Sequence, residues 1–259
     1  VDIIPLDLNN LYGLYSASNK YKKLNQDFQP DVVHAHMVHA NIFARLCRFF
    51  CPMPHLVCTA HSNNEGGQGR MLAYRLTHHL SDLTTNVSQS ASESFETLGA
   101  VPKNGIKTIY NGIDLDKFKY NANAREVLMH ELQLDHDSIL LLAVGRFHTA
   151  KDYPNLLRAF AQIKQNTDHN VELLIAGDGE EREHIQQLIG SLAIQKNVHL
   201  LGRRNDIPQL MSAADLFVLS SSFEGFGLVV AEAMACKTFV VATDCGGVNE
   251  VMGQTGICC

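Results

Sequence analysis

The sequence has no run of 18 apolar residues, so it predicts no helix that spans a membrane. Its longest apolar stretches, such as residues 139–144, have the length of a strand. Positive charge is also scarce, because 21 basic residues stand against 27 acidic ones and leave a net charge of −6. Since nucleic-acid phosphates need a basic face, this balance argues against a nucleic-acid partner. It still allows a local basic pocket for one diphosphate.

The seven cysteines show no C-x-x-C spacing, which argues against a zinc site. We expect buried or reduced thiols, as in a cytosolic protein. Two D-x-D triplets, at residues 114–116 and 135–137, have the donor atoms for a divalent cation. Both lie in a polar segment rather than at the end of a strand, so no metal site is predicted.

Apolar residues make up 46% of the chain and charged residues 19%, the composition of a soluble globular protein. The length of 259 residues fits one large domain or two of ordinary size. Strand-like runs alternate with helical ones, and most strand-like runs are continuously apolar, which is typical of parallel strands buried on both faces. The predicted strands are residues 31–34, 55–59, 83–87, 107–110, 139–144, 171–176, 198–201, 215–220 and 238–242.

Between these runs, apolar residues recur with helical spacing, as in Ile185, Leu188, Ile189 and Leu192. Alternating strands and helices predict doubly wound parallel sheets. The turn signal Asn111-Gly112 opens a polar stretch, so we predict a first domain at 1–112, an interdomain segment at 113–137 and a second domain at 138–259. Ligands of such sheets bind beyond the carboxyl ends of the strands, so two facing sheets would form a cleft.

The two ends of the sequence both look interrupted. A strand-like run at residues 1–6 begins directly with Val1, and Cys259 falls inside what looks like another strand. We therefore expect a piece of a longer chain, cut at both ends.

Two cations flank the loop after the predicted strand at 139–144. Arg146 follows that strand, and Lys151 precedes the next helix. Both can point toward the mouth of a cleft, where fixed cations would stabilise a departing diphosphate more than its bound precursor. The alternative is two solvated charges in a loop.

The segment from Glu224 to Glu232 follows the predicted strand at 215–220. Its glycines permit close approach of the backbone, and a helix beginning near Phe226 would offer N–H groups and a positive dipole end to an anion. Carboxylates accept hydrogen bonds from sugar hydroxyls, so one glutamate can hold a sugar and the other a ribose. The alternative is a pair of structural glutamates.

Histidines follow two of the early strands. His34 and His36 end the run at 31–36, and His61 follows the run at 55–59. A histidine with a pKa near ~6.5 can donate or accept a proton at a reacting centre. His36 is the first candidate and His61 the second, with a structural role as the alternative for each.

The run from Ile175 to Glu180 begins like a dinucleotide-binding fingerprint, but Arg182 stands where the third glycine would be. A hydride-transfer site is therefore not supported. We interpret Gly177 and Gly179 as a tight turn between a strand and a helix.

Taken together, these segments resemble the retaining glycosyltransferases of family 4, the group 1 transferases of GT-B fold. The matching pieces are DVVHAH, VCTAH, TIYNGIDLDKF, VGRFHTAKD, LLIAGDGEER, VHLLGRRNDIPQLMSAADLFVLSSSFEGFGLVVAEAMA and VVATDCGGVNEVM. They run over nearly the whole chain and are strongest from residue 144 to 252. Their order and spacing carry the resemblance, since any one piece alone would be weak.

The resemblance implies a role for each candidate. Arg146 and Lys151 would grip the donor diphosphate, Glu232 would hold the ribose, and Glu224 would act near the donor sugar together with the acceptor-side His36. The remaining implied donor contacts are the backbone N–H groups of Phe226, Gly227 and Leu228, and Arg203 beside the base.

The implied reaction moves a hexose-type sugar from a nucleotide diphosphate sugar to a saccharide or lipid-linked saccharide, with retention and without a cofactor or metal. The donor is a UDP-sugar or a GDP-sugar, with UDP favoured. It would serve the synthesis of a cell-surface polysaccharide or lipopolysaccharide. The place implied is the cytoplasm, at the inner face of a membrane where the acceptor is lipid-linked. A GT-B sugar-nucleotide epimerase and a non-catalytic nucleotide-sugar-binding protein remain the alternatives.

Overall fold

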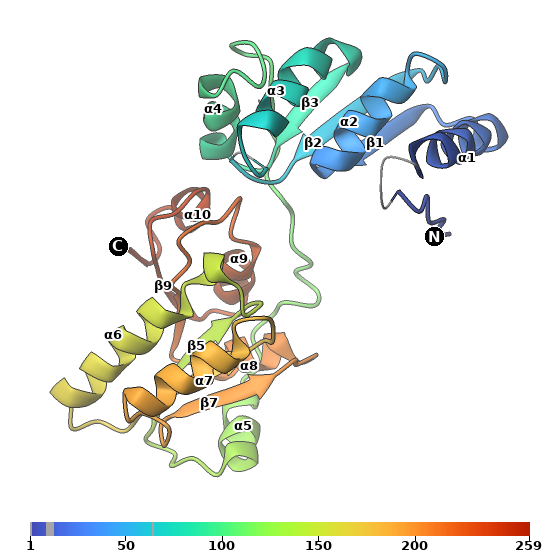
Figure 1. The fold of residues 1–259 in the computed structure, drawn as a ribbon. Coiled ribbons are helices and arrows are strands. Elements are labelled where there is room, and N and C mark those ends of the chain that lie inside the picture. The colour runs from blue at the N-terminus through green and yellow to red at the C-terminus, as the bar shows by residue number, and fades with distance from the viewer. Residues whose placement is uncertain (1, 9–12, 64) are drawn as a thin grey trace. The chain divides into compact units, whose positions relative to one another are not determined.

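A computed structural model describes residues 2–8, 13–63 and 65–259, and the chain divides into two compact units, Val1–Tyr110 and Asn111–Cys259 (Figure 1). Each unit has a parallel sheet of its own, one of four strands and one of six. The predicted α/β class with two parallel sheets is confirmed.

The first unit has the strand order β1-β2-β3-β4, so each strand pairs with the next in sequence. Helices connect the strands, as parallel pairing requires. Its elements are α1 Gly13–Phe28, β1 Val32–His36, α2 Met37–Cys47, β2 His55–Ala60, α3 Gln68–Thr77, β3 Leu83–Asn86, α4 Gln89–Thr97 and β4 Lys107–Thr108.

The second unit has the strand order β10-β9-β8-β5-β6-β7. Helices follow the strands in turn, and a short 3₁₀ turn at Thr149–Lys151 precedes α6. Its elements are α5 Ala124–Leu132, β5 Ile139–Val144, α6 Tyr153–Asn166, β6 Val171–Ala176, α7 Arg182–Ser191, β7 Val198–Gly202, α8 Ile207–Ala213, β8 Leu216–Leu219, α9 Leu228–Ala235, β9 Phe239–Ala242, α10 Val248–Met252 and β10 Ile257–Cys258.

The second sheet is buried on both faces, which explains its continuous apolar runs. Along β5, Leu140 and Leu142 face one hydrophobic cluster, whereas Leu141 and Ala143 face another. Because successive side chains of a strand point to opposite faces, a strand covered by helices on both sides must be apolar at every position.

Two segments of the first unit differ from the doubly buried strands of the second sheet. Strand β1, at one edge of its sheet, carries three exposed side chains, those of Val32, His34 and His36. The strand expected at residues 1–6 is also absent over the described residues 2–6, and Val1 lies outside the described part. The side chain of Ile3 is 91% exposed, whereas Leu6 packs against the cluster of Ala17, Phe43 and Cys47.

Candidate functional site

The six-stranded sheet reverses its strand order between β5 and β8. The chain runs from β5 outward through β6 to β7, then returns to the other side of β5 for β8, β9 and β10. In open α/β sheets, ligands bind at such a reversal, beyond the carboxyl ends of the two central strands. The segments that leave β5 and β8 are therefore where a site is expected, and they carry Lys151 and Glu224 respectively.

Lys151 and Glu224 meet across this reversal. The Lys151 Nζ lies 2.5 Å from Oε1 of Glu224, and the Ser221 hydroxyl donates to the same oxygen at 2.8 Å. Their side chains are only 23% and 14% exposed, so the attraction is less screened by water than in a surface pair. The pair remains partly open to solvent, so a ligand can reach both charges.

Hydrogen bonds to backbone carbonyl oxygens join the segments that carry Lys151 and Glu224. The Ser220 hydroxyl donates to the Lys151 carbonyl oxygen at 2.8 Å, and the Ser222 amide donates to the Ala150 carbonyl oxygen at 3.0 Å. The Thr243 hydroxyl, after β9, donates to the Ser221 carbonyl oxygen at 2.5 Å. Residues after β5, β8 and β9 thus form one connected edge.

Two glycines allow the loops of this edge to touch. A Cβ on Gly246, whose φ is +56°, would lie 1.7 Å from the Glu224 carbonyl oxygen. A Cβ on Gly177, whose φ is +154°, would lie 1.8 Å from the Gly145 carbonyl oxygen. Both positions need glycine for its backbone conformation and for space. The turn at 177–179, read from the sequence as tight, packs directly on the loop that carries Arg146.

Arg146 does not pair with the same carboxylate as Lys151. Its guanidinium binds Oε2 of Glu180 through Nε at 3.1 Å and through a terminal nitrogen at 3.0 Å. The side chain is 70% exposed. Water screens an ion pair that is this exposed, so little free energy holds Arg146 to Glu180.

Helix α9 begins at Leu228, two residues later than the sequence suggested, with Gly227 as its N-cap in the left-handed conformation at φ +85°. Phe226 is buried just before it. Glu232 lies on the second turn of α9, and burial raises its pKa while Lys117 acts in the opposite direction. A partly desolvated carboxylate of this kind gains from donors such as ribose hydroxyls.

The arginines after β7 differ from each other. Arg203 is exposed, and its charge is among the causes, after Arg182 and the Gly179 amide, that lower the pKa of Asp178. Arg204 instead donates to a carboxylate oxygen of Asp206 at 2.6 Å and to one of Glu131 at 2.5 Å. These bonds give Arg204 a structural role.

Three histidines of the first unit, His34, His36 and His61, form one cluster at the carboxyl edge of β1 and β2. His36 Nδ1 lies 3.0 Å from His61 Nε2, and the rings of His34 and His36 lie 4.0 Å apart between centroids. His34 Nε2 lies 2.7 Å from the Thr59 hydroxyl oxygen. The two histidine candidates from the sequence are therefore in direct contact, although they lie 25 positions apart in the sequence.

Burial lowers the pKa of His34 and of His61, and the neighbouring imidazoles add to the effect. Both rings therefore favour the neutral form near neutral pH. Around His61, a buried network escaped sequence reasoning: Glu65 accepts the His61 amide at 2.9 Å and the Tyr74 hydroxyl at 2.6 Å, and Asn41 donates to that hydroxyl at 2.8 Å. Its members are far apart in sequence and follow no motif.

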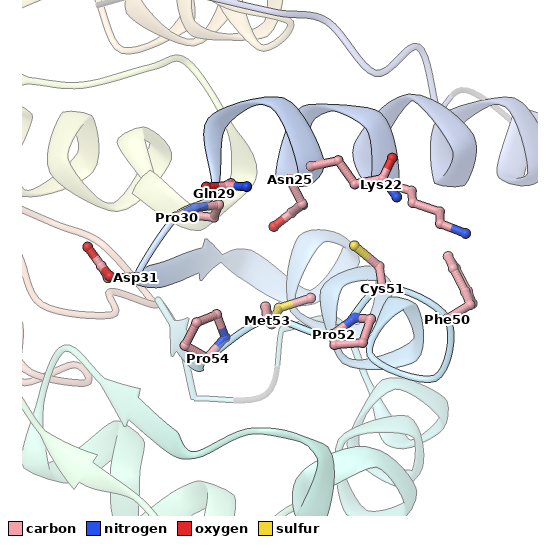
Figure 2. Close-up of a pocket in the computed structure, with 11 residues that line it drawn as sticks. Lys22, Asn25, Gln29, Pro30, Asp31, Phe50, Cys51, Pro52, Met53 and Pro54 are labelled. Carbon is pink, nitrogen blue, oxygen red and sulfur yellow. The ribbon is translucent and has the colours of Figure 1, made fainter.

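A cavity of about 420 Å³ in the first unit lies away from this cluster. Figure 2 shows it between Lys22 and Asn25 of α1 and the loop that carries Met53 and Pro54. Asp31 and Pro54 immediately precede β1 and β2, so the cavity opens at the amino edge of the sheet, opposite the histidines. It is therefore not the candidate site.

Over the described residues, no helix is long and apolar enough to cross a bilayer. Within the same residues, no group of three or more His, Cys, Asp or Glu side chains is arranged to hold a metal ion. Asp114, from one of the two D-x-D triplets, uses its Oδ1 to accept the amides of Asp116 and Lys117, each at 3.0 Å. That carboxylate stabilises a turn.

Comparison with known families agrees with this geometry. The profile of the glycosyl transferases group 1 matches residues 124–259, and that of glycosyltransferase family 4 matches residues 2–117. The chain therefore belongs to the group 1, family 4 glycosyltransferases.

Among curated proteins, the chain is similar to the N-acetyl-α-D-glucosaminyl L-malate synthase of Bacillus anthracis, with 34% identity over 69% of this chain and 46% of that protein. It is also similar to an N-acetylgalactosaminyltransferase of Campylobacter jejuni that acts on a diphospho-undecaprenol-linked saccharide, with 30% identity over 91% of this chain and 64% of that protein. The chain thus spans less than two thirds of the length of these relatives.

Among solved structures, Anabaena Alr3699/HepE in complex with UDP-glucose matches with a TM-score of 0.85 at 26% identity, over 97% of this chain and 70% of that one. A sucrose-phosphate synthase from Thermosynechococcus elongatus matches with a TM-score of 0.83 at 23% identity, over 100% of this chain and 67% of that one. At this identity the match supports the fold alone.

Proposed function

We propose that this chain forms the donor-binding unit and part of the acceptor-binding unit of a retaining glycosyltransferase. The enzyme would transfer a hexose-type sugar from a UDP-sugar to a saccharide or lipid-linked saccharide at the cytoplasmic side of a membrane. The observation that carries the proposal is the Lys151–Glu224 pair, which spans the strand reversal of the six-stranded sheet in a member of this family.

The chemistry needs positive charge where the diphosphate departs. Lys151 is held by Glu224, whose carboxylate also accepts the Ser221 hydroxyl. Glu224 shortly precedes the predicted phosphate-facing amides of Phe226, Gly227 and Leu228. Arg146 can leave its exposed pairing with Glu180 at small cost and add a second cation. These two side chains would neutralise the charge that develops on the leaving phosphate, which is why we propose a metal-independent reaction.

Glu224 and Glu232 would divide the remaining donor contacts. The Glu224 carboxylate, oriented by Lys151 and Ser221, would accept hydroxyls of the transferred sugar. Glu232 would accept ribose hydroxyls, Arg203 would lie beside the base, and the amides of Phe226, Gly227 and Leu228 would face the phosphates. With retention, the acceptor attacks from the face that the phosphate leaves, and the leaving phosphate takes the acceptor proton.

On the acceptor side, His36 would hold a hydroxyl at the reacting centre, with His61 bonded to its Nδ1. Support for UDP and for a lipid-linked acceptor comes from the relatives: HepE is solved with UDP-glucose, and the Campylobacter enzyme acts on an undecaprenol-linked saccharide. Cell-surface polysaccharide or lipopolysaccharide synthesis fits both.

The test is calorimetry on the full-length protein with UDP and with GDP, in EDTA. We expect UDP to bind, and Lys151→Ala to weaken that binding at least about tenfold. Wild-type affinity in Lys151→Ala would remove the proposal. Incubation with UDP-sugar alone is the second arm, because a new epimer formed without acceptor would identify an epimerase, and donor binding without turnover would identify a binding protein.

A further inference from the structure

Tyr153 is a buried titratable side chain that the proposed reaction does not use. It is the first residue of α6 and is 3% exposed. Its hydroxyl donates to the Gly145 carbonyl oxygen at 3.0 Å. Gly145 directly follows β5, so this bond joins the two ends of the loop that carries both Arg146 and Lys151.

The loop packs closely at this bond. A Cβ on Gly145 would lie 3.2 Å from the Lys151 Cε and 3.2 Å from the Tyr153 hydroxyl oxygen. The aliphatic part of Lys151 and the tyrosine hydroxyl therefore both lie close to Gly145. We expect a change in the tyrosine contact to alter the space next to Gly145, which the lysine side chain also borders.

The other side of the loop is held by the backbone. The Gly145 amide donates to the Ala176 carbonyl oxygen at 3.0 Å, and the Phe147 amide donates to the Asp178 carbonyl oxygen at 3.0 Å. The Phe147 ring meets the Tyr153 ring edge-on, with 5.1 Å between centroids. Strand β6 and its turn thus fix the start of the loop, and Tyr153 connects that fixed start to the lysine end.

Tyr153 also lies close enough to Glu224 to feel the charge of its carboxylate. A small crevice at the strand reversal is lined by Tyr153 together with Lys151, Ser220 and Ser221. Burial raises the pKa of Tyr153, and the charge of Glu224 raises it further. The hydroxyl therefore stays protonated and remains a donor to Gly145 across the working pH range.

We propose that Tyr153 is a positioning residue that closes the loop 145–153 and thereby sets the place of Lys151 relative to Glu224. The inference rests on the proposed donor site, but the closure of the loop is a separate property of the fold. It makes donor affinity depend on a hydroxyl that never contacts the donor.

The test compares two variants of the full-length protein. Tyr153→Phe removes the hydroxyl and keeps the ring. Thr238→Val is its matched control, because the buried Thr238 hydroxyl, next to the amino end of β9, also donates to a backbone carbonyl oxygen, that of Met211. Each variant loses one buried hydrogen bond within the same unit, so similar losses of melting temperature are expected.

The two variants should differ at the donor site. We expect Tyr153→Phe to weaken UDP binding, measured by calorimetry in EDTA, by about threefold to tenfold, and to lower kcat/KM for the donor while the KM for the acceptor is unchanged. Thr238→Val should stay within about twofold of wild type. Equal UDP affinity in both variants, with equal loss of melting temperature, overturns the proposal.

Hydrogen exchange followed by mass spectrometry gives a readout that does not need UDP. Amides of residues 145–152 should exchange faster in Tyr153→Phe than in wild type or in Thr238→Val. Unchanged exchange there would also overturn the inference, whereas faster exchange in a protein that fails to bind UDP would contradict the proposed function alone. Should Tyr153→Phe not fold, Gly145→Ala disturbs the same contact and must give the same affinity loss.

Discussion

The Lys151 ammonium lies 2.5 Å from Oε1 of Glu224, so a cation from the loop after β5 is paired with a carboxylate from the loop after β8. Each of the two side chains holds the other in place, so both charges are already positioned for a ligand of the proposed site. Removing either partner leaves a mostly buried charge without its counter-charge, which costs more than the pair itself contributes.

For this pair we expect Lys151→Ala to raise the dissociation constant of UDP at least about tenfold, because a charged hydrogen bond worth about 1.5–3 kcal/mol is lost and Glu224 is left unpaired. Glu224→Gln should retain UDP binding within about tenfold but lower turnover much more, since the amide cannot orient sugar hydroxyls as a carboxylate does. Calorimetry and steady-state rates measure the two effects. Retained turnover in Glu224→Gln would contradict the role given to this carboxylate.

If Arg146 binds the donor as proposed, Glu180 competes with the donor for it. Removal of the competitor in Glu180→Ala should therefore leave UDP affinity unchanged or tighten it by up to about fivefold, because water screens so exposed an ion pair. Arg146→Ala should weaken UDP binding. If Glu180→Ala instead weakens UDP binding as much as Arg146→Ala, the pairing with Glu180 positions Arg146 rather than competing for it.

In the proposed donor site, Glu232 would make donor binding depend on pH. Burial raises its pKa above the ordinary glutamate value of 4.5 in the free protein, whereas ribose hydroxyls favour the charged form. UDP affinity should be full above the raised pKa and should fall as the pH drops through it, with proton release on binding in that window. Calorimetry in two buffers of different ionisation enthalpy measures the release.

The matched variant for that experiment is Glu232→Gln, in which the pH dependence attributed to this carboxyl should disappear. A pH profile that is the same in wild type and in Glu232→Gln would assign the dependence to another group.

The close packing of backbone at Gly246 can be tested by measuring the stability of a variant. Gly246→Ala should destabilise the protein by at least about 2 kcal/mol, because its Cβ would overlap the Glu224 carbonyl oxygen and its φ of +56° disfavours alanine. Gly190→Ala is the control, since no atom lies within 4 Å of its Cβ and the residue is in α7. It should stabilise the protein by about 0.5–1 kcal/mol. Urea denaturation measures both.

The histidine cluster predicts an acid-sensitive first unit. Burial lowers the pKa of His34 and His61 below 6.5, so the unfolded chain binds protons more readily than the folded one. The stability linked to these rings is full above pH ~6.5 and is lost as the pH falls through their lowered pKa values. Titration of the imidazole signals by NMR should show both midpoints below 6.5, and midpoints above 6.5 would contradict the burial argument.

Much of the architecture follows from the spacing of apolar residues along the sequence. The continuous apolar run at 139–144 predicts a strand covered on both faces, and β5 occupies those residues with alternate side chains in two clusters. Strand β1 is not a continuous apolar run, because it contains His34 and His36, and both histidines are exposed. The run at residues 2–6 forms no strand, since a strand forms only where a partner strand is present.

The residue types of the candidate site were also readable. Arg146, Lys151, Glu224 and Glu232 stand out because charged residues follow buried strands, and their chemical roles remain predictions. The sequence did not reveal which charges meet. It suggested a pair of cations, whereas the structure joins Lys151 to Glu224 and Arg146 to Glu180.

The sequence by itself determined the elements, their α/β alternation and the family, because these depend on local period and on the order of short motifs. The tertiary structure decided the contacts between residues far apart in the chain, among them Lys151 with Glu224, His36 with His61 and Tyr153 with the Gly145 turn. The physical reason is that strand order sets which loops become neighbours, and strand order depends on how helices cover a sheet rather than on any one segment.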